Sequence, residues 1–149
     1  MRMSRAHLVN AALAGAATGL RSTVGVGALV ETGSPGLTGA WATKPVRVVA
    51  GLGVAGELVV DKLPKTPSRL DPPGLLARVA LAAVAGAVIA RASDRRLAPA
   101  IVVAAGTAVV SARVGHDLRS FASTRVPPFA VAIGEDAIAV GLALLAARR

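Results

Sequence analysis

Five long apolar stretches, separated by short segments rich in proline, glycine or charge, constrain what this chain can fold into. Each is near the roughly 17 to 25 residues that an α-helix needs to cross a bilayer. None alternates apolar and polar residues over a useful length, so strands are not expected. The pattern predicts an all-α, polytopic membrane helix bundle with about five transmembrane spans in a single membrane domain (1–149). The predicted spans are 7–30, 46–63, 74–90, 97–114 and 129–147.

The composition also favours a lipid environment. Hydrophobic residues make up 54% of the chain, the mean hydropathy is +0.63, and only 17% of the residues are charged. An ordinary soluble domain has about 25% charged residues. Many of the apolar positions are Ala, Gly, Val or Leu, and small residues let helices approach closely when lipid supplies no hydrophobic drive between them. "GAATG" (15–19) is a GxxxG pattern that predicts such a helix contact.

The net charge of +9 raises the question of nucleic acid as a partner. The chain has no Tyr, one Trp and two Phe, so it offers almost no platform for stacking bases. Its cations lie between the apolar stretches instead of forming one stripe. This distribution fits a membrane protein with basic loops. We therefore expect the lipid bilayer, and not nucleic acid, to be the partner.

The ends of the first and last spans bear on topology. An odd number of crossings and a slight excess of Lys and Arg favour a cytoplasmic N-terminus and a C-terminus on the other side, and the alternative is a dual orientation. The beginning, "MRMSRAHLVNAALAGAATG", also has the pattern of a signal peptide. The apolar character resumes after Thr23, which favours a retained first helix.

Two acids interrupt the second stretch, in "VAGELVVDKLP" (54–64). If that helix starts near position 46, Glu57 lies about 16 Å along it, close to the midplane. An ionised carboxylate at this depth must be paired or beside water, or it takes up a proton. Asp61 follows at i+4 on the same face, beside Lys62. Arg21 in the first stretch is a candidate partner for Glu57, and the alternative is that it snorkels or ends a shorter helix.

The fifth stretch repeats the pattern, with Glu135 and Asp136 after a glycine. Consecutive residues point about 100° apart on a helix, so the two acids must face different neighbours. One is expected to face the bundle interior, and the other needs its own partner. Arg113 and Arg119 are the candidate cations.

An internal duplication would relate the two acidic regions. "GLRST" (19–23) resembles "DLRSF" (117–121), and "VAGEL" (54–58) resembles "AIGED" (132–136). With one helix between the two pairs, this predicts an inverted two-helix repeat around a central helix, an arrangement that many transporters use. Matches this short also arise by chance in a chain of this length.

No motif in the chain predicts catalysis, a cofactor or a metal. "GLGVAG" (51–56) has the form G-x-G-x-x-G but lies inside an apolar stretch with no strand before it. His116 and Asp117 are better explained as a solvated loop pair than as metal ligands, because His7 is the only other histidine. The serines lack a His and Asp constellation for nucleophilic catalysis. We expect a protein that is not an enzyme and that has no cofactor. An intramembrane enzyme is the third alternative, after the two functions given below, and a bound cofactor or substrate-dependent turnover in purified protein would favour it.

Three segments together carry a family resemblance: "GLRS" in the first stretch, "GELVVDKLPKTPSR" followed by "PPGLLAR", and "GEDAIAVGLALLAARR". They resemble the bacterial membrane family catalogued as domain of unknown function 4126, over most of the chain. The resemblance implies a multi-helix protein of the bacterial inner (plasma) membrane and brings no reaction with it. It also implies that a set of residues belongs to family motifs. These are Arg21, Glu57, Asp61, Lys62, Pro64, Pro67, Ser68, Arg69, Glu135 and Asp136.

Two functional hypotheses follow from the charges in the apolar stretches. In the first, the chain is a small transporter or ion-permeation unit, and its acids bind a cation or proton. The candidate ion-binding residues are Glu57, Asp61, Glu135 and Asp136, and the candidate charge partners are Arg21, Lys62, Arg113 and Arg119. In the second, the chain is a non-catalytic accessory subunit whose ion pairs set helix register. Its partner would be a second copy of itself or other membrane subunits.

Overall fold

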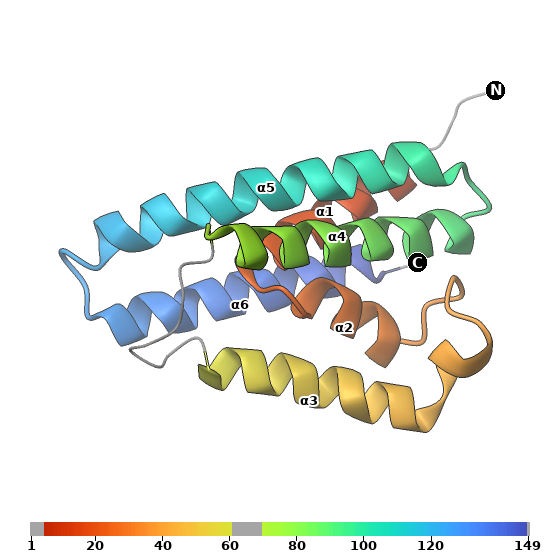
Figure 1. Ribbon diagram of the computed structural model, residues 1–149, viewed down its shortest axis with the longest axis horizontal. Helices are drawn as coiled ribbons and strands as arrows, with labels where there is room; N and C mark the ends of the chain where they lie inside the picture. Colours follow the sequence, from red (N-terminus) through yellow and green to blue (C-terminus); the bar gives the residue numbers. More distant parts are fainter. Residues whose placement is uncertain (1–4, 61–69, 149) are drawn as a thin grey trace.

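The computed structural model describes residues 5–60 and 70–148, and within these residues the fold is all-helical (Figure 1). The elements, in chain order, are α1 (Ala6–Leu20), α2 (Val24–Glu31), the short 3-10 helix η1 (Gly39–Ala42), α3 (Lys44–Val60), α4 (Pro72–Ala92), α5 (Leu97–Ala122) and α6 (Pro128–Ala146). This confirms the predicted helical class.

Helix α1 lies at the centre of the bundle and packs against α4, α5 and α6. Helix α2 turns back beside α1 and α6, and α3 lies outside it, packed mainly against α2 (Figure 1). The described core therefore consists of α1, α2, α4, α5 and α6, and α3 is a peripheral helix.

Proline sets where two of the long helices begin. Pro72 and Pro73 open α4 after Asp71, whose backbone is extended, and Pro128 opens α6. Proline is favoured in a first turn because the amide hydrogen that it lacks would have no helical acceptor there. Between α4 and α5, Asp94 adopts a left-handed conformation with φ of 49°. Asp tolerates this region better than most residues, and here it closes the tight turn.

The central contact between α1 and α5 is made through small residues. The buried face of α5 repeats alanine at every fourth position: Ala100, Ala104, Ala108 and Ala112. A Cβ added to Gly15 would lie 2.1 Å from the Ala104 carbonyl oxygen, and one added to Gly19 would lie 2.2 Å from that of Ala108. The helices approach this closely only because both positions are glycine.

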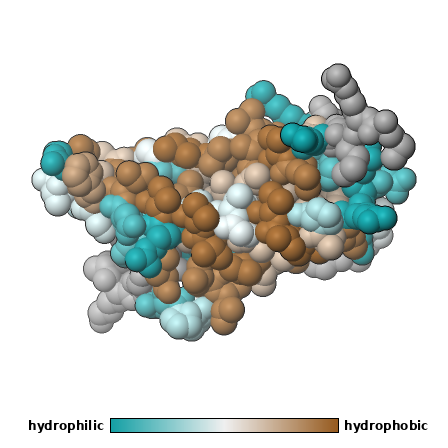
Figure 2. All heavy atoms as spheres, turned by 90° about the horizontal axis from the view of Figure 1, so that it is seen from above, coloured by the Kyte–Doolittle hydropathy of each residue, from teal (hydrophilic) through white to brown (hydrophobic). Residues whose placement is uncertain are grey.

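Three helices, α4, α5 and α6, are long and apolar enough to cross a membrane, and α1 is a shorter apolar helix. The outside of the bundle carries many exposed large apolar side chains, such as Val102, Val110 and Ile138. In Figure 2 hydrophobic residues cover much of the middle of the molecule, and hydrophilic ones gather toward its ends. A surface of this kind suits lipid. The expected count of about five spans is therefore not confirmed.

The predicted first span (7–30) is wrong as a single helix. Helix α1 ends at Leu20, Arg21 has an extended backbone (φ −139°, ψ 114°), and α2 runs back antiparallel to α1. A Cβ on Gly25 of α2 would lie 2.1 Å from the Thr18 hydroxyl oxygen, so the two segments form a tight helical hairpin. The break falls at Arg21, Ser22 and Thr23, the polar residues that interrupt the apolar stretch.

The hairpin also changes the predicted topology. The Asn10 side-chain amide of α1 donates to the carbonyl oxygen of Arg148, just after α6, over 3.4 Å. The described ends of the chain thus lie at the same end of the bundle, contrary to the expected placement on opposite sides. Because α1 and α5 run in the same direction, the antiparallel relation that an inverted repeat requires is absent between them (Figure 1). The repeat is not confirmed.

Candidate functional site

The break between α1 and α2 is held by the Glu57 carboxylate of α3. Its two oxygens accept hydrogen bonds from the backbone amides of Ser22 (2.5 Å) and Thr23 (2.7 Å). The Thr23 hydroxyl donates to the same carboxylate over 2.7 Å. Thr23 is the N-cap residue of α2 and Ser22 lies just before it, so the helix itself offers their amides no acceptor, and the helix dipole places partial positive charge at this end. Glu57 therefore caps α2 from a neighbouring helix, which makes an interrupted helix tolerable inside an apolar bundle.

Arg21 pairs with Asp136 and not with Glu57, the partner predicted for it. The Arg21 Nε donates to Asp136 Oδ1 over 2.6 Å, and its terminal nitrogen forms an ion pair with the same oxygen. The Arg21 side chain is 0% exposed and that of Asp136 is 16% exposed. Asp136 lies about 12 Å along α6, near the middle of that helix. The pair therefore joins α1 to α6 deep in the bundle.

Arg78 of α4 is the residue that sequence reasoning missed. Its guanidinium lies 3.9 Å from Glu57 Oε1 and donates to the Gly74 carbonyl oxygen over 3.2 Å. The side chain is only 7% exposed. The available signal was a lone arginine inside the apolar stretch 74–90. Arginine at such a depth needs an acid or backbone carbonyls as partners, and here it has both.

Glu135 and Asp136 face different helices, as their 100° separation requires. Glu135 turns toward α5, where its carboxylate lies 3.7 Å from the Arg119 guanidinium. The side chain of Glu135 is 9% exposed and that of Arg119 is 29% exposed. Of the two candidate cations, Arg119 is the one that pairs with Glu135. Arg113 instead pairs with Asp117 one turn along α5, on the exposed surface.

A cavity of about 490 Å³ lies between α5 and α6 and includes the Arg119–Glu135 pair in its wall. The remaining wall is mostly apolar, with Leu118, Phe121 and Ile138 among its residues. Glu57 does not line this cavity. Glu57 and Glu135 are thus half-buried and buried, respectively, but they do not share this cavity.

The cluster as a whole is balanced in charge. Three acids (Glu57, Glu135 and Asp136) lie among three arginines (Arg21, Arg78 and Arg119) contributed by α1, α3, α4, α5 and α6. Balance lowers the cost of burying charge in a medium of low polarity. Asp61 and Lys62, the other two candidates, lie outside the described residues. Among the described residues, no group of three or more His, Cys, Asp and Glu is arranged to hold a metal ion.

Comparison with known proteins identifies no relative: no family model, no curated protein and no solved structure matches this chain.

Proposed function

We propose that this protein is a small membrane transporter or ion-permeation unit, and that the break between α1 and α2 is its working site. The observation that carries the proposal is the broken helix, whose amides at Ser22 and Thr23 bind the Glu57 carboxylate. The buried Arg78 lies 3.9 Å from that carboxylate, and the buried Arg21 stands at the break itself. Non-helical backbone at membrane depth is tolerated where it is enclosed by protein, and broken helices form the sites of many transporters.

The acids are the groups that would bind the transported ion. A cation or proton arriving at Glu57 neutralises the carboxylate that caps α2 and weakens its hold on the two amides. Arg21 and Arg78 keep the empty site close to neutral. Binding of the ion would thereby weaken the contact between α3 and the α1–α2 hairpin. The position of α3 relative to the hairpin could then differ between the empty and the loaded site.

Flux into vesicles containing the purified protein tests this function. Wild-type protein is expected to move a proton or a monovalent cation, and Glu57→Gln and Glu135→Gln are expected to reduce the flux severely. Asp117→Asn is the matched control, because Asp117 is an exposed acid of α5 outside the cluster. Flux that is equal in the wild type and the two Gln variants would remove the acids from the mechanism.

A second candidate is a non-catalytic subunit of a membrane complex. It is favoured by the Arg21–Asp136 pair, in which the arginine is fully buried and serves to join two helices. In that case the purified wild type shows no flux with any cation tested, and substitutions of the acids abolish expression or assembly. Isolation from native membrane with companion subunits, or as a second copy of this chain, then identifies the partner.

The family and location belong to the same proposal. The motif resemblance supports membership of the membrane family described above, and the three long apolar helices support residence in a membrane. We propose the bacterial plasma membrane, with both described chain ends on the cytoplasmic side. Among the described residues, the cations at that end of the bundle outnumber the acids. By the bounds of the helices, the cations lie at the starts of α1 and α3, at the end of α4, in the α4–α5 turn and after α6: Arg5, Lys44, Arg47, Arg91, Arg95, Arg96 and Arg148. The acids are Glu31, the last residue of α2, and Asp94 in the α4–α5 turn.

A further inference from the structure

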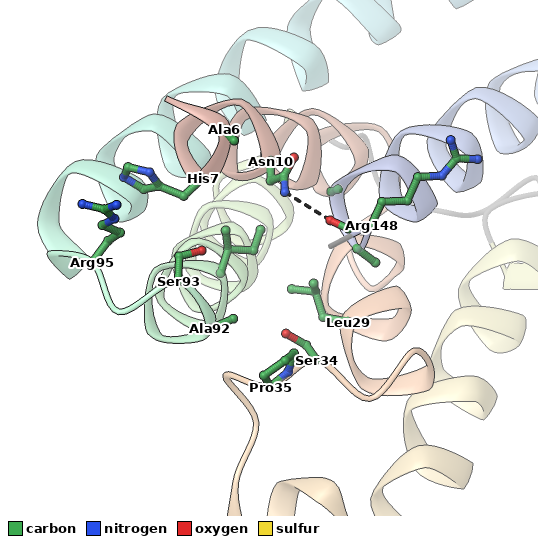
Figure 3. Close-up of a pocket in the computed structure, with 13 residues that line it drawn as sticks. Ala6, His7, Asn10, Leu29, Ser34, Pro35, Ala92, Ser93, Arg95 and Arg148 are labelled. Atoms are coloured by element: carbon green, nitrogen blue, oxygen red, sulfur yellow. Dashed lines mark hydrogen bonds between the residues drawn. The ribbon is translucent and has the colours of Figure 1, made fainter. Parts of the chain in front are cut away.

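A second cavity, of about 360 Å³, lies at the opposite end of the bundle from the α5–α6 turn, where α1 begins and α6 ends (Figure 3). Its floor is apolar and comes from three different helices: Leu29 of α2, Ile89 of α4 and Ala146 of α6, each of which is buried. This floor is separate from the charge cluster at the helix break.

The polar groups of this cavity are donors or can act as donors. Arg95 lies in the α4–α5 turn, and Figure 3 shows its guanidinium beside the imidazole of His7, which is 7% exposed. Ser34 and Ser93 add hydroxyl groups to the rim. None of the described lining residues is acidic, and Arg95 has no ion-pair partner among the residues that the structure describes.

Helix carbonyls offset the donor character of the cavity only in part. Helices α2, α4 and α6 all end near the cavity, which brings their partial negative ends close to it. Backbone amides of the following turns already bind carbonyls at these ends: Ser34 to Leu29 (2.9 Å), Arg95 to Ala90 (2.9 Å) and Arg148 to Leu145 (3.2 Å). The side chain of Arg148 points away from the cavity, so Arg95 is the charged side chain placed to meet a ligand (Figure 3).

We propose that this cavity binds the phosphate group of an anionic phospholipid from the surrounding bilayer. The phosphate oxygens would accept hydrogen bonds from the Arg95 guanidinium and from the Ser34 and Ser93 hydroxyl groups. The apolar floor would contact the upper part of the lipid chains. Basic pockets between transmembrane helices on the cytoplasmic side are suited to such headgroups, because the cytoplasmic leaflet holds anionic lipid. The lipid would bridge α1, α2, α4 and α6, which frame the cavity.

The test uses the full chain in a neutral detergent, where no charged membrane surface contributes. Dioctanoyl phosphatidylglycerol is titrated into the protein, and bound lipid is counted by native mass spectrometry, with thermal unfolding as a second readout. Wild-type protein is expected to bind one molecule and to unfold at a higher temperature with it. Dioctanoyl phosphatidylcholine, whose headgroup has no net charge, is expected to bind more weakly.

Two variants and one matched control separate this site from general surface charge. Arg95→Gln is expected to weaken binding at least about tenfold, the factor that corresponds to the loss of one hydrogen bond to a charged group. Ser93→Leu places an apolar side chain at the rim and is expected to reduce binding without changing the unfolding temperature of the lipid-free protein. Arg96→Gln, the next residue in the same exposed turn, does not line the cavity and is expected to bind as the wild type does.

Three results would overturn the proposal. They are an equal loss of lipid affinity in Arg95→Gln and Arg96→Gln, equal binding of the phosphatidylglycerol and the phosphatidylcholine, and a rise in unfolding temperature with inorganic phosphate that equals the rise with phosphatidylglycerol. The last would assign the cavity to a soluble anion. None of these outcomes depends on flux, so the test of the headgroup site is independent of the test of the transport function.

Discussion

Replacing the two halves of the Arg21–Asp136 pair, one at a time and together, measures what the buried charge contributes. We consider Arg21→Met, Asp136→Leu and the double variant, which keep side-chain volume roughly constant. Removing one partner of a buried pair costs about 3–5 kcal/mol of folding free energy, because the other charge stays buried without compensation. Arg21 is 0% exposed, so its charge stays out of contact with water when Asp136 is removed.

The two single variants should not be equal. Arginine cannot lose its charge in a protein, whereas a carboxyl group can take up a proton and become neutral. Asp136 also keeps 16% of its side-chain surface exposed. Asp136→Leu is therefore expected to be the more damaging of the two. The double variant removes both charges and is expected to cost less than either single change, since an apolar pair of similar volume often replaces a buried ion pair without loss.

The assay is equilibrium unfolding in mixed micelles, followed by the loss of helical circular dichroism. The coupling energy between the two positions is expected to exceed about 2 kcal/mol. The exposed pair Arg113–Asp117 serves as control, with a coupling of about 0.3–0.5 kcal/mol, as for other pairs four residues apart on a helix. Single changes that cost less than about 1 kcal/mol, or effects that simply add, would refute the argument that burial makes the pair interdependent.

Two further predictions concern helix packing and topology. Gly19→Ala places a Cβ 1.9 Å from the Ser111 hydroxyl oxygen and 2.2 Å from a backbone carbonyl of α5, so it is expected to destabilise the protein in the unfolding assay described above. In the control variant Gly106→Ala the new Cβ meets nothing within 4 Å, and this change is expected to stabilise the protein by about 0.5–1 kcal/mol. Equal effects of the two changes would contradict the packing argument. The chain has no native cysteine, so an introduced cysteine is the only thiol that a reagent can label. In intact cells, a reagent that does not cross membranes is expected to label Arg125→Cys in the α5–α6 turn and not Arg5→Cys just before α1, because these segments lie at opposite ends of the bundle and the chain ends are proposed to be cytoplasmic (Figure 1). The reverse labelling would contradict the proposed orientation.

The apolar stretches predicted most of the helices well. Those at 74–90, 97–114 and 129–147 correspond to α4, α5 and α6, and the structure extends α5 to Ala122. They were predictable because hydropathy over some twenty residues is a local property of the chain. The small residues of "GAATG" likewise predicted a close helix contact, since few side chains allow one.

The pairing of charges was much less predictable. The sequence indicated that Glu57, Glu135 and Asp136 need partners, but it suggested Glu57 for Arg21 and left Arg78 out. Pairing depends on the rotation and depth of each helix relative to its neighbours. Arg21 and Asp136 are 115 positions apart in the chain, and no local pattern encodes their distance in space.

By itself, then, the sequence determined that this chain forms apolar helices, that these suit lipid, and that a few charges must be sheltered among them. Each of these follows from the residues within one stretch. The tertiary structure alone decided that the stretch 7–30 breaks into two helices at Arg21. A continuous helix satisfies its own amides, so a break is stable only where another group accepts them. Here that group is Glu57, 34 residues along the chain from Thr23, and only the folding of α3 against α2 brings it there.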